Sequence, residues 1–419
     1  MKKAGLCLSV LLGTSLFLAA CGGDNNEDAG DSGSNNGEAT GGADKITIFQ
    51  SKVEISEPLE RMAEEYEEET GVEVEIWGTT GDDYFQQLQI RMNSDQGPSI
   101  FTIGHASEAH LIDSYIYDMS DESYVENIAE NMAMEINGKL VGVPYGVEGF
   151  GLVYNKDLID PEDVADYDSF VNTLAQYEGD DIEGLSLSQE GYFLIGHMSN
   201  YPFSLQEDNI EFMEQVTDGE VDFSDVEEFN AFAQMLEDIR EYTVNPLEMN
   251  YDSQIGDFAT GRTAMIHQGN WAYGMFNDYE LDFEIGMLPV PLMDNDKLAV
   301  GVGQNWAVNA NKEDDEIQAA LDFLEWMHTS ETGHRYIVEE FDAIPAYTNI
   351  EAPDLDPLSQ TVLDYTNEGQ TIPWSQGHYP ANLVINDWVP VAEDFFIDDS
   401  VTGQDVINAM YEAWMATGE

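Results

Sequence analysis

The stretch "KITIFQSKVEISEPLERMAEEYEEETGVEVEI", Lys45 to Ile76, decides the class of fold. Its first five residues alternate apolar and polar side chains and predict a strand, as do the last five, Val72 to Ile76. Between them Ser56 is a candidate helix N-cap and Gly71 a helix end. The apolar stripe of this predicted helix consists of Leu59, Met62, Ala63 and Tyr66. The stretch therefore predicts a strand, a helix and a second strand.

Predicted helices and strands continue to alternate up to residue 103. A glutamine-rich helix is predicted from Asp82 to about Asn93, with Phe85, Leu88 and Met92 facing inward, and a short apolar strand follows from Pro98 to Ile103. Strands and helices that alternate at this spacing predict a layered α/β lobe with a largely parallel sheet.

The chain is long enough for two lobes, because 419 residues exceed the size of one ordinary core. Two strand-like runs between Gly138 and Ile159 could carry the chain from one lobe into another. The helix predicted from Ser224 to Thr243 has a buried stripe, and Val300 to Ala310 is another strand-like run that begins with glycines. No internal repeat is apparent.

The N-terminus predicts export and a tether. Lys2 and Lys3 precede an apolar run from Leu6 to Leu18, which is typical of a signal peptide. The motif "LAAC", which ends at Cys21, resembles the lipobox of bacterial lipoproteins, where the cysteine is diacylated and becomes the mature N-terminus. The polar residues 22–44 predict a flexible spacer. Cys7 is the one other cysteine, so the folded part has neither a disulfide nor a reactive thiol.

The charge is extremely acidic, with 84 acidic and 13 basic residues and a net charge of −71. Removal of Lys2 and Lys3 with the signal peptide would make it −73. Such a chain is not expected to bind nucleic acid, because phosphate contacts need lysine and arginine. The acids are spread along the chain, which predicts a solvated acidic surface. Adaptation to high salt and an alkaline habitat both remain open as its cause.

Motifs for catalysis and for metal binding are absent from the sequence. There is no Gly-x-Ser-x-Gly elbow and no Walker loop. The seven histidines lack metal-ligand spacing, and the acid clusters lack the EF-hand order. No cofactor and no metal site are therefore expected. Paired carboxylates for glycoside hydrolysis stay open, since every acid here has acidic neighbours.

Several segments together resemble the carbohydrate-binding extracellular solute-binding proteins of ABC importers, the family of maltose-binding protein. They include "EEYEEETGVEVEI", "NGKLVGVPYGVEGFGLVYNKDLI", "LSQEGYF" and "FATGRTAMIHQGNWAYG". Their order and spacing carry the resemblance, which covers Lys45 to Glu419.

The resemblance implies two α/β lobes, each a mainly parallel sheet covered by helices, joined by hinge strands that close on a sugar. The implied segments are a signal peptide (1–20), a lipidated spacer (21–44), a first lobe (45–145 and 301–350) and a second lobe (146–300 and 351–419). It also implies a non-enzymatic monomer, anchored by lipid at the extracellular face of the cytoplasmic membrane, that delivers a carbohydrate to the permease.

The resemblance also implies the site residues. The strand "TAMIH" would deliver Trp271 to the edge of the cleft, where its ring covers one face of a sugar. Glu148 and Glu190 would accept hydrogen bonds from sugar hydroxyls, with Tyr192 beside them. The other implied ligand-binding residues are Lys52, Glu54, His105, Tyr145, Asn270, Gln304, Asn305, Trp374, His378 and Tyr379.

The sequence departs from the maltodextrin-binding pattern in two places. Gly191 replaces a proline beside Glu190, and Ile103, Ala106 and Ser107 replace tryptophan, aspartate and arginine. Alternatives therefore stay open: Trp271 as a core or interface residue, an aromatic cage for a quaternary ammonium compound, and a secreted carbohydrate-active enzyme.

Overall fold

The computed structural model describes residues 43–79, 81–94, 96–129, 132–179, 181–352 and 354–417. The predicted signal peptide, Cys21 and the spacer up to residue 42 lie outside the described residues. No helix in the described part of the chain is long and apolar enough to cross a membrane.

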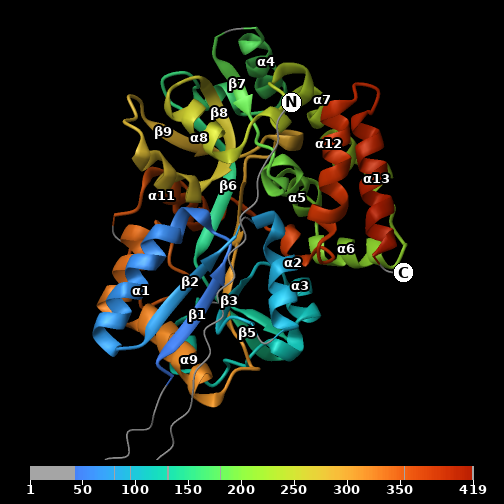
Figure 1. The fold of residues 1–419 in the computed structure, drawn as a ribbon. Helices are drawn as coiled ribbons and strands as arrows, with labels where there is room; N and C mark the ends of the chain where they lie inside the picture. The colour runs from blue at the N-terminus through green and yellow to red at the C-terminus, as the bar shows by residue number, and fades with distance from the viewer. Residues whose placement is uncertain are drawn as a thin grey trace, which may run out of the picture. The chain divides into compact units, whose positions relative to one another are not determined.

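The first of two six-stranded sheets is built around the opening strand (Figure 1). In sheet order its strands are β2 (Glu73–Gly78), β1 (Lys45–Gln50), β3 (Ile100–Ile103), β11 (Asn305–Val308), β5 (Lys139–Pro144) and β4 (Met134–Ile136). The second sheet has the order β12 (Thr371–Pro373), β10 (Leu298–Val302), β6 (Val147–Asn155), β8 (Thr263–Gly269) and β7 (Glu183–Ser186), and β9 (Ile285–Leu288) also pairs with β6. Each sheet with its helices is called a lobe here.

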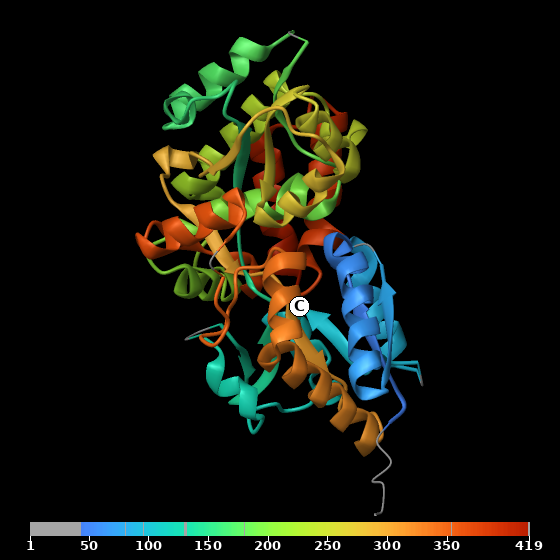
Figure 2. The same cartoon turned by 90° about the vertical axis from the view of Figure 1, so that its left-hand side faces the viewer.

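Helices are packed against both sheets. They are α1 (Ser56–Thr70), α2 (Gly81–Met92), α3 (Ala106–Leu111), α4 (Tyr167–Tyr177), α5 (His197–Ser204), α6 (Asn209–Thr217), α7 (Glu227–Tyr242), α8 (Tyr251–Ala259), α9 (Asp314–Thr329), α10 (Glu331–Arg335), α11 (Pro357–Asn367), α12 (Val389–Ile397) and α13 (Gly403–Ala416). Figure 2 shows α1 and α9 side by side, and the ring of Tyr66 on α1 lies 4.9 Å from that of Phe323 on α9. The predicted stripe of α1 is buried and Gly71 ends the helix with φ 83°, as expected.

The two lobes confirm the predicted α/β architecture, but the prediction of mainly parallel sheets is wrong. In the first sheet only β1–β2 and β1–β3 are parallel, and β3–β11, β11–β5 and β5–β4 are antiparallel. In the second sheet β10–β12 and β7–β8 are parallel, whereas β6 pairs antiparallel with β8, β9 and β10. Parallel pairing needs a long crossover connection. Asn137 and Gly138 instead make a two-residue hairpin turn, with φ 53° and 75°.

Three segments of chain cross between the lobes and are bonded to one another. The backbone N–H of Tyr145 donates to the carbonyl of Gln304 at 2.9 Å, and that of Val147 donates to Ile344 at 2.8 Å. A Cβ added at Gly146 would lie 3.1 Å from the Ile344 carbonyl oxygen, so glycine permits this close approach. The lobe boundaries at residues 146, 301 and 351 stay a prediction.

Candidate ligand-binding site

Polar side chains meet where the first lobe faces the crossing segments. Lys52 follows the carboxyl end of β1, and Glu54 lies in the short helix Val53–Ile55 directly after it. Tyr145 lies between β5 and β6, and Glu148 is the second residue of β6. Ligands of open α/β sheets bind outside the carboxyl ends of the strands, so this position is suited to a site.

A lysine and two carboxylates form a buried ionic group there. The Nζ atom of Lys52 lies 2.5 Å from Oε1 of Glu148 and 3.2 Å from Oε1 of Glu54. The Lys52 side chain is 12% exposed and that of Glu148 is 6% exposed. Removal of Lys52 would leave two carboxylates without a counter-ion in a largely buried place, which is strongly destabilising.

Burial and the neighbouring charges shift the pKa values of Lys52 and Glu148 in opposite directions. Burial would lower the pKa of Lys52, but the carboxylates of Glu148 and Glu54 outweigh it and raise that pKa. Burial raises the pKa of Glu148, and the ammonium of Lys52 offsets part of that rise. The ammonium is therefore held charged between the carboxylates.

Aromatic rings surround the ionic group. The Nζ atom of Lys52 lies 5.1 Å from the ring centroid of Tyr145 and 5.9 Å from that of Trp271. The Trp271 ring is perpendicular to that of Trp374 at 6.3 Å, and both contact His197, at 5.4 and 6.4 Å. We call this set the junction cluster: Lys52, Glu54, Tyr145, Glu148, Trp271, Trp374 and His197.

Glycines make room for the large rings of the junction cluster. A Cβ at Gly269 would lie 2.3 Å from the Trp271 ring, so the ring packs directly on the backbone at the end of β8. A Cβ at Gly303 would lie 2.2 Å from Oε2 of Glu148 and 3.1 Å from the ring of Trp374. The glycines that begin the run from Val300 to Ala310 therefore have a packing role.

His105 and Tyr192 form a second polar contact, between the two lobes. Nε2 of His105 lies 2.9 Å from the hydroxyl of Tyr192, and Nδ1 lies 2.7 Å from the carbonyl oxygen of Gln376. The Tyr192 ring lies 5.9 Å from that of His197, which links this contact to the junction cluster.

Several buried polar atoms in and around the junction cluster have no hydrogen-bond partner among the residues that the structure describes. They include Nε1 of Trp374, Nδ1 of His197, Oε1 of Gln304 and the hydroxyl of Tyr251. The Tyr251 ring lies 4.8 Å from that of Phe193, which in turn stacks near Trp271 at 6.3 Å. An unpaired buried polar group is costly, so these atoms are suited to meet the polar groups of a ligand.

Four of the predicted residues are placed elsewhere. The Asn270 amide is buried and bonded at both ends, to the Gly149 N–H at 2.9 Å and to the Ser359 hydroxyl at 3.1 Å. Tyr379 is buried and donates to the Ser199 carbonyl at 3.1 Å. Asn305 is buried in β11, and His378 is exposed. The structure does not bring these side chains into the junction cluster.

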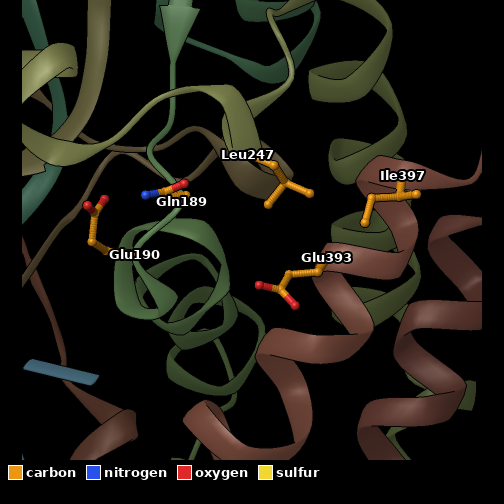
Figure 3. A pocket seen from close by; sticks show the side chains of 5 residues that line it. All are labelled: Gln189, Glu190, Leu247, Glu393 and Ile397. Atoms are coloured by element: carbon orange, nitrogen blue, oxygen red, sulfur yellow. The ribbon is translucent and has the colours of Figure 1, made fainter. Parts of the chain in front are cut away.

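Glu190 is not a member of the junction cluster, but it bonds to Tyr251, which lies beside that cluster. Its Oε1 atom accepts from the backbone N–H of Tyr251 at 3.0 Å, at the start of α8. Together with Gln189, Leu247, Glu393 and Ile397, it lines a separate pocket of about 420 Å³ on the second lobe (Figure 3). Figure 3 shows Glu393 and Ile397 on α12, across the pocket from the segment that carries Gln189 and Glu190.

Three aromatic residues near Trp271 were missed by sequence reasoning. Phe150 lies 4.4 Å from His197 and 5.1 Å from Trp374, and Phe193 faces Trp271. Phe193 and His197 lie in and just after the π-helix Tyr192–Gly196. The motif "EGYF" already contained Phe193, but a π-helix has no sequence period that would have placed His197 beside it.

No group of three or more His, Cys, Asp or Glu side chains is placed to hold a metal ion among the residues that the structure describes. The junction cluster combines three kinds of group. Aromatic faces, a charged lysine–carboxylate group and unpaired polar atoms lie within one small volume at the meeting of two lobes.

The sequence of this chain matches a known protein family. A family model described as "Bacterial extracellular solute-binding protein" matches residues 61–374. The chain is 22% identical over 392 residues to the maltooligosaccharide ABC transporter solute-binding lipoprotein of Streptococcus pneumoniae R6, and the alignment covers 89% of this chain and 88% of that protein.

Solved structures agree on the fold. The solute-binding protein RafE in complex with raffinose has a TM-score of 0.74 at 17% identity, and the match covers 90% of this chain and 100% of that one. MalE of Bdellovibrio bacteriovorus bound to maltotriose has a TM-score of 0.71 at 18% identity, with 89% and 98% covered. Because the family model spans well over half of the chain, this protein belongs to the bacterial extracellular solute-binding proteins.

Proposed function

We propose that this protein is the substrate-binding lipoprotein of an ABC importer, and that it captures an oligosaccharide between its two lobes at the junction cluster. The observation that carries the proposal is the meeting of Trp271 and Trp374 with a buried Lys52–Glu148 pair and with unpaired polar atoms. A sugar has apolar C–H faces that suit the rings and hydroxyls that suit the polar atoms.

Two competing ligand classes fit this cluster less well. The ammonium of Lys52 already lies over the faces of Tyr145 and Trp271, so a quaternary ammonium ligand would meet a like charge there. For a glycosidase, the two carboxylates nearest to the rings would have to act as separate acid and base. Glu54 and Glu148 instead share one lysine.

Binding experiments on the purified protein test the proposal. Maltotriose and raffinose, the sugars named for two of the similar structures, are the first probes. Maltooligosaccharides of increasing length follow, and betaine is the control. A sugar at about 100 times its Kd should stabilise the fold by roughly 2.7 kcal/mol in a thermal melt. Chromatography of the same sugar after incubation should show it unchanged. Stabilisation by betaine alone, or cleaved sugar, would contradict the proposal.

The lipid anchor at Cys21, the extracellular location, the monomeric state and delivery to a permease are part of the same proposal. They are supported by the "LAAC" motif and by the lipoprotein from S. pneumoniae that the chain resembles. In cells fed radiolabelled palmitate, wild type should be labelled and Cys21→Ala should not. Equal label in both would contradict the anchor.

A further inference from the structure

The contact of His105 with the second lobe consists of bonds between protein atoms. We infer that His105 is a latch, a positioning residue that holds the two lobes closed without any sugar. The role differs from that of a ligand-binding residue, and it rests on bonds within the protein alone.

The first lobe holds the latch rigidly. His105 follows β3 and directly precedes α3. The Glu108 carboxylate accepts from the backbone N–H groups of Gly104 at 3.2 Å and His105 at 3.3 Å, which fixes the backbone on both sides of the peptide bond between them. The imidazole is therefore presented from an anchored helix start, and little conformational entropy remains to be lost when it binds the other lobe.

Both ring nitrogens of His105 form hydrogen bonds with the second lobe. The carbonyl of Gln376 can only accept, so Nδ1 at 2.7 Å carries the hydrogen. Nε2 lies 2.9 Å from the Tyr192 hydroxyl and accepts from it when that nitrogen carries no hydrogen. The two rings also stack, with centroids 6.0 Å apart and planes at 18°. The imidazole thus has a hydrogen-bond partner at each ring nitrogen, and the two partners come from separate elements.

A further bond between the lobes strengthens the contact, and hydrogen bonds hold the segment of the second lobe that His105 contacts. The hydroxyl of Ser107 donates to the Tyr379 carbonyl at 2.8 Å, again from the first lobe to the second. The short helix Ser375–His378 that carries Gln376 is tied down, because Ser375 Oγ bonds to the hydroxyl of Ser204 at 2.7 Å and accepts from the amide of Asn209 at 2.8 Å.

The latch is coupled to the proposed site through Tyr192 and His197. A ligand that binds only the closed form has an apparent Kd equal to its intrinsic Kd divided by the closed fraction. Bonds that raise the closed fraction without ligand therefore tighten binding and need not touch the sugar. A net hydrogen bond of ordinary strength changes such an equilibrium about fivefold.

Distance measurements between the lobes test the latch. Spin labels would be placed on cysteines introduced at the exposed residues Asp121 and Glu220, one in each lobe, in a chain whose Cys7 and Cys21 are replaced by serine. Distances would be measured without any sugar. His105→Ala removes both bonds, whereas His105→Asn keeps a donor near the Nδ1 position and Tyr192→Phe keeps the ring. His110→Ala is the matched control, because His110 is an exposed histidine of helix α3, which begins directly after His105.

We expect a major short-distance population in the wild type and in His110→Ala. In His105→Ala, which loses two bonds of about fivefold each, the ratio of closed to open molecules should fall about 25-fold, with smaller falls in His105→Asn and Tyr192→Phe. Unchanged distances in both His105 variants, or a wild type that is wholly open, would overturn the latch. Thermal melts identify a variant that fails to fold, and Tyr192→Phe then decides. Because no sugar is present, the outcome does not depend on whether the proposed function holds.

Discussion

Variants of Trp271 distinguish a ligand-binding residue from a residue that serves only the packing of the protein. Its ring is partly buried, packs against two apolar clusters of the protein, and donates from Nε1 to Gln268 at 2.9 Å. The ring therefore contributes to stability whatever its role in binding. Affinity and stability have to be measured on the same variant.

Trp271→Ala should weaken sugar binding roughly 30-fold to 1,000-fold, since a central aromatic anchor contributes about 2–4 kcal/mol. Trp271→Phe should lose less, because part of the face remains. Calorimetric titration and thermal melts check both. A core tryptophan would instead cost about 3–5 kcal/mol of folding stability. Unchanged affinity with a large drop in melting temperature would assign Trp271 to the core.

Gly303 tests whether the close packing of Glu148 and Trp374 matters for binding. In Gly303→Ala the new methyl group would overlap the Glu148 carboxylate and press on the Trp374 ring. Overpacking of this kind costs about 1–3 kcal/mol, so we expect a lower melting temperature and at least tenfold weaker binding. Gly377→Ala is the matched control, because a Cβ there meets no atom within 4 Å. Equal behaviour of the two variants would contradict the described packing.

At the scale of elements, local periodicity predicted the helices better than the sheets. The stripe of α1 follows from the spacing of Leu59, Met62, Ala63 and Tyr66, and those side chains are buried. Strand direction depends on which strands meet, and β11 joins the first sheet from about 200 residues further along the chain. The spacing of apolar residues within one segment cannot predict that pairing. The Asn137–Gly138 turn was a readable hairpin signal that the sequence analysis did not use.

The candidate site was predictable only in part, for a similar reason. Lys52, Glu54, Tyr145, Glu148, Trp271 and Trp374 were all candidates and lie in one cluster. Asn270 and Tyr379 were candidates through the family resemblance of their segments, but their side chains bond within the second lobe and the crossing segments. With 84 acids in the chain, composition could not show which carboxylates would be buried beside a lysine.

His328, in helix α9, should make the folding stability measurably dependent on pH. Burial lowers the pKa of His328 to about 3, against a weaker opposing effect of its bond to the Leu324 carbonyl at 2.7 Å. Between pH 3 and 6.5 the unfolded chain binds a proton that the folded protein does not, so stability falls as the pH is lowered through this window.

The expected slope from His328 is at most about 1.4 kcal/mol per pH unit. Denaturant titrations at pH 7, 6 and 5 should show a steeper loss of stability in the wild type than in His328→Gln. The carboxylates titrate in both proteins, so their effect cancels in the comparison. Parallel curves for the two proteins would contradict a neutral, buried His328.

At the scale of the whole molecule, the net charge of −71 should dominate the response to salt. Screening weakens repulsion between exposed carboxylates over the Debye length, which is about 10 Å at 0.1 M and about 3 Å at 1 M. We therefore expect the melting temperature to rise from low to molar NaCl, with sucrose as a control for solvent effects. A flat or falling melting temperature would contradict adaptation to salt.

The central claim is that an oligosaccharide binds at the junction cluster, between the two lobes. A crystal structure with the tightest-binding sugar of the calorimetric panel tests it most directly. The account predicts a sugar ring against Trp271 or Trp374, with its hydroxyls at hydrogen-bond distance, about 2.7–3.2 Å, from the Lys52–Glu148 pair and from the unpaired Nδ1 of His197. A sugar found instead in the pocket beside Glu190 and Glu393, or anywhere away from the junction cluster, would contradict the account.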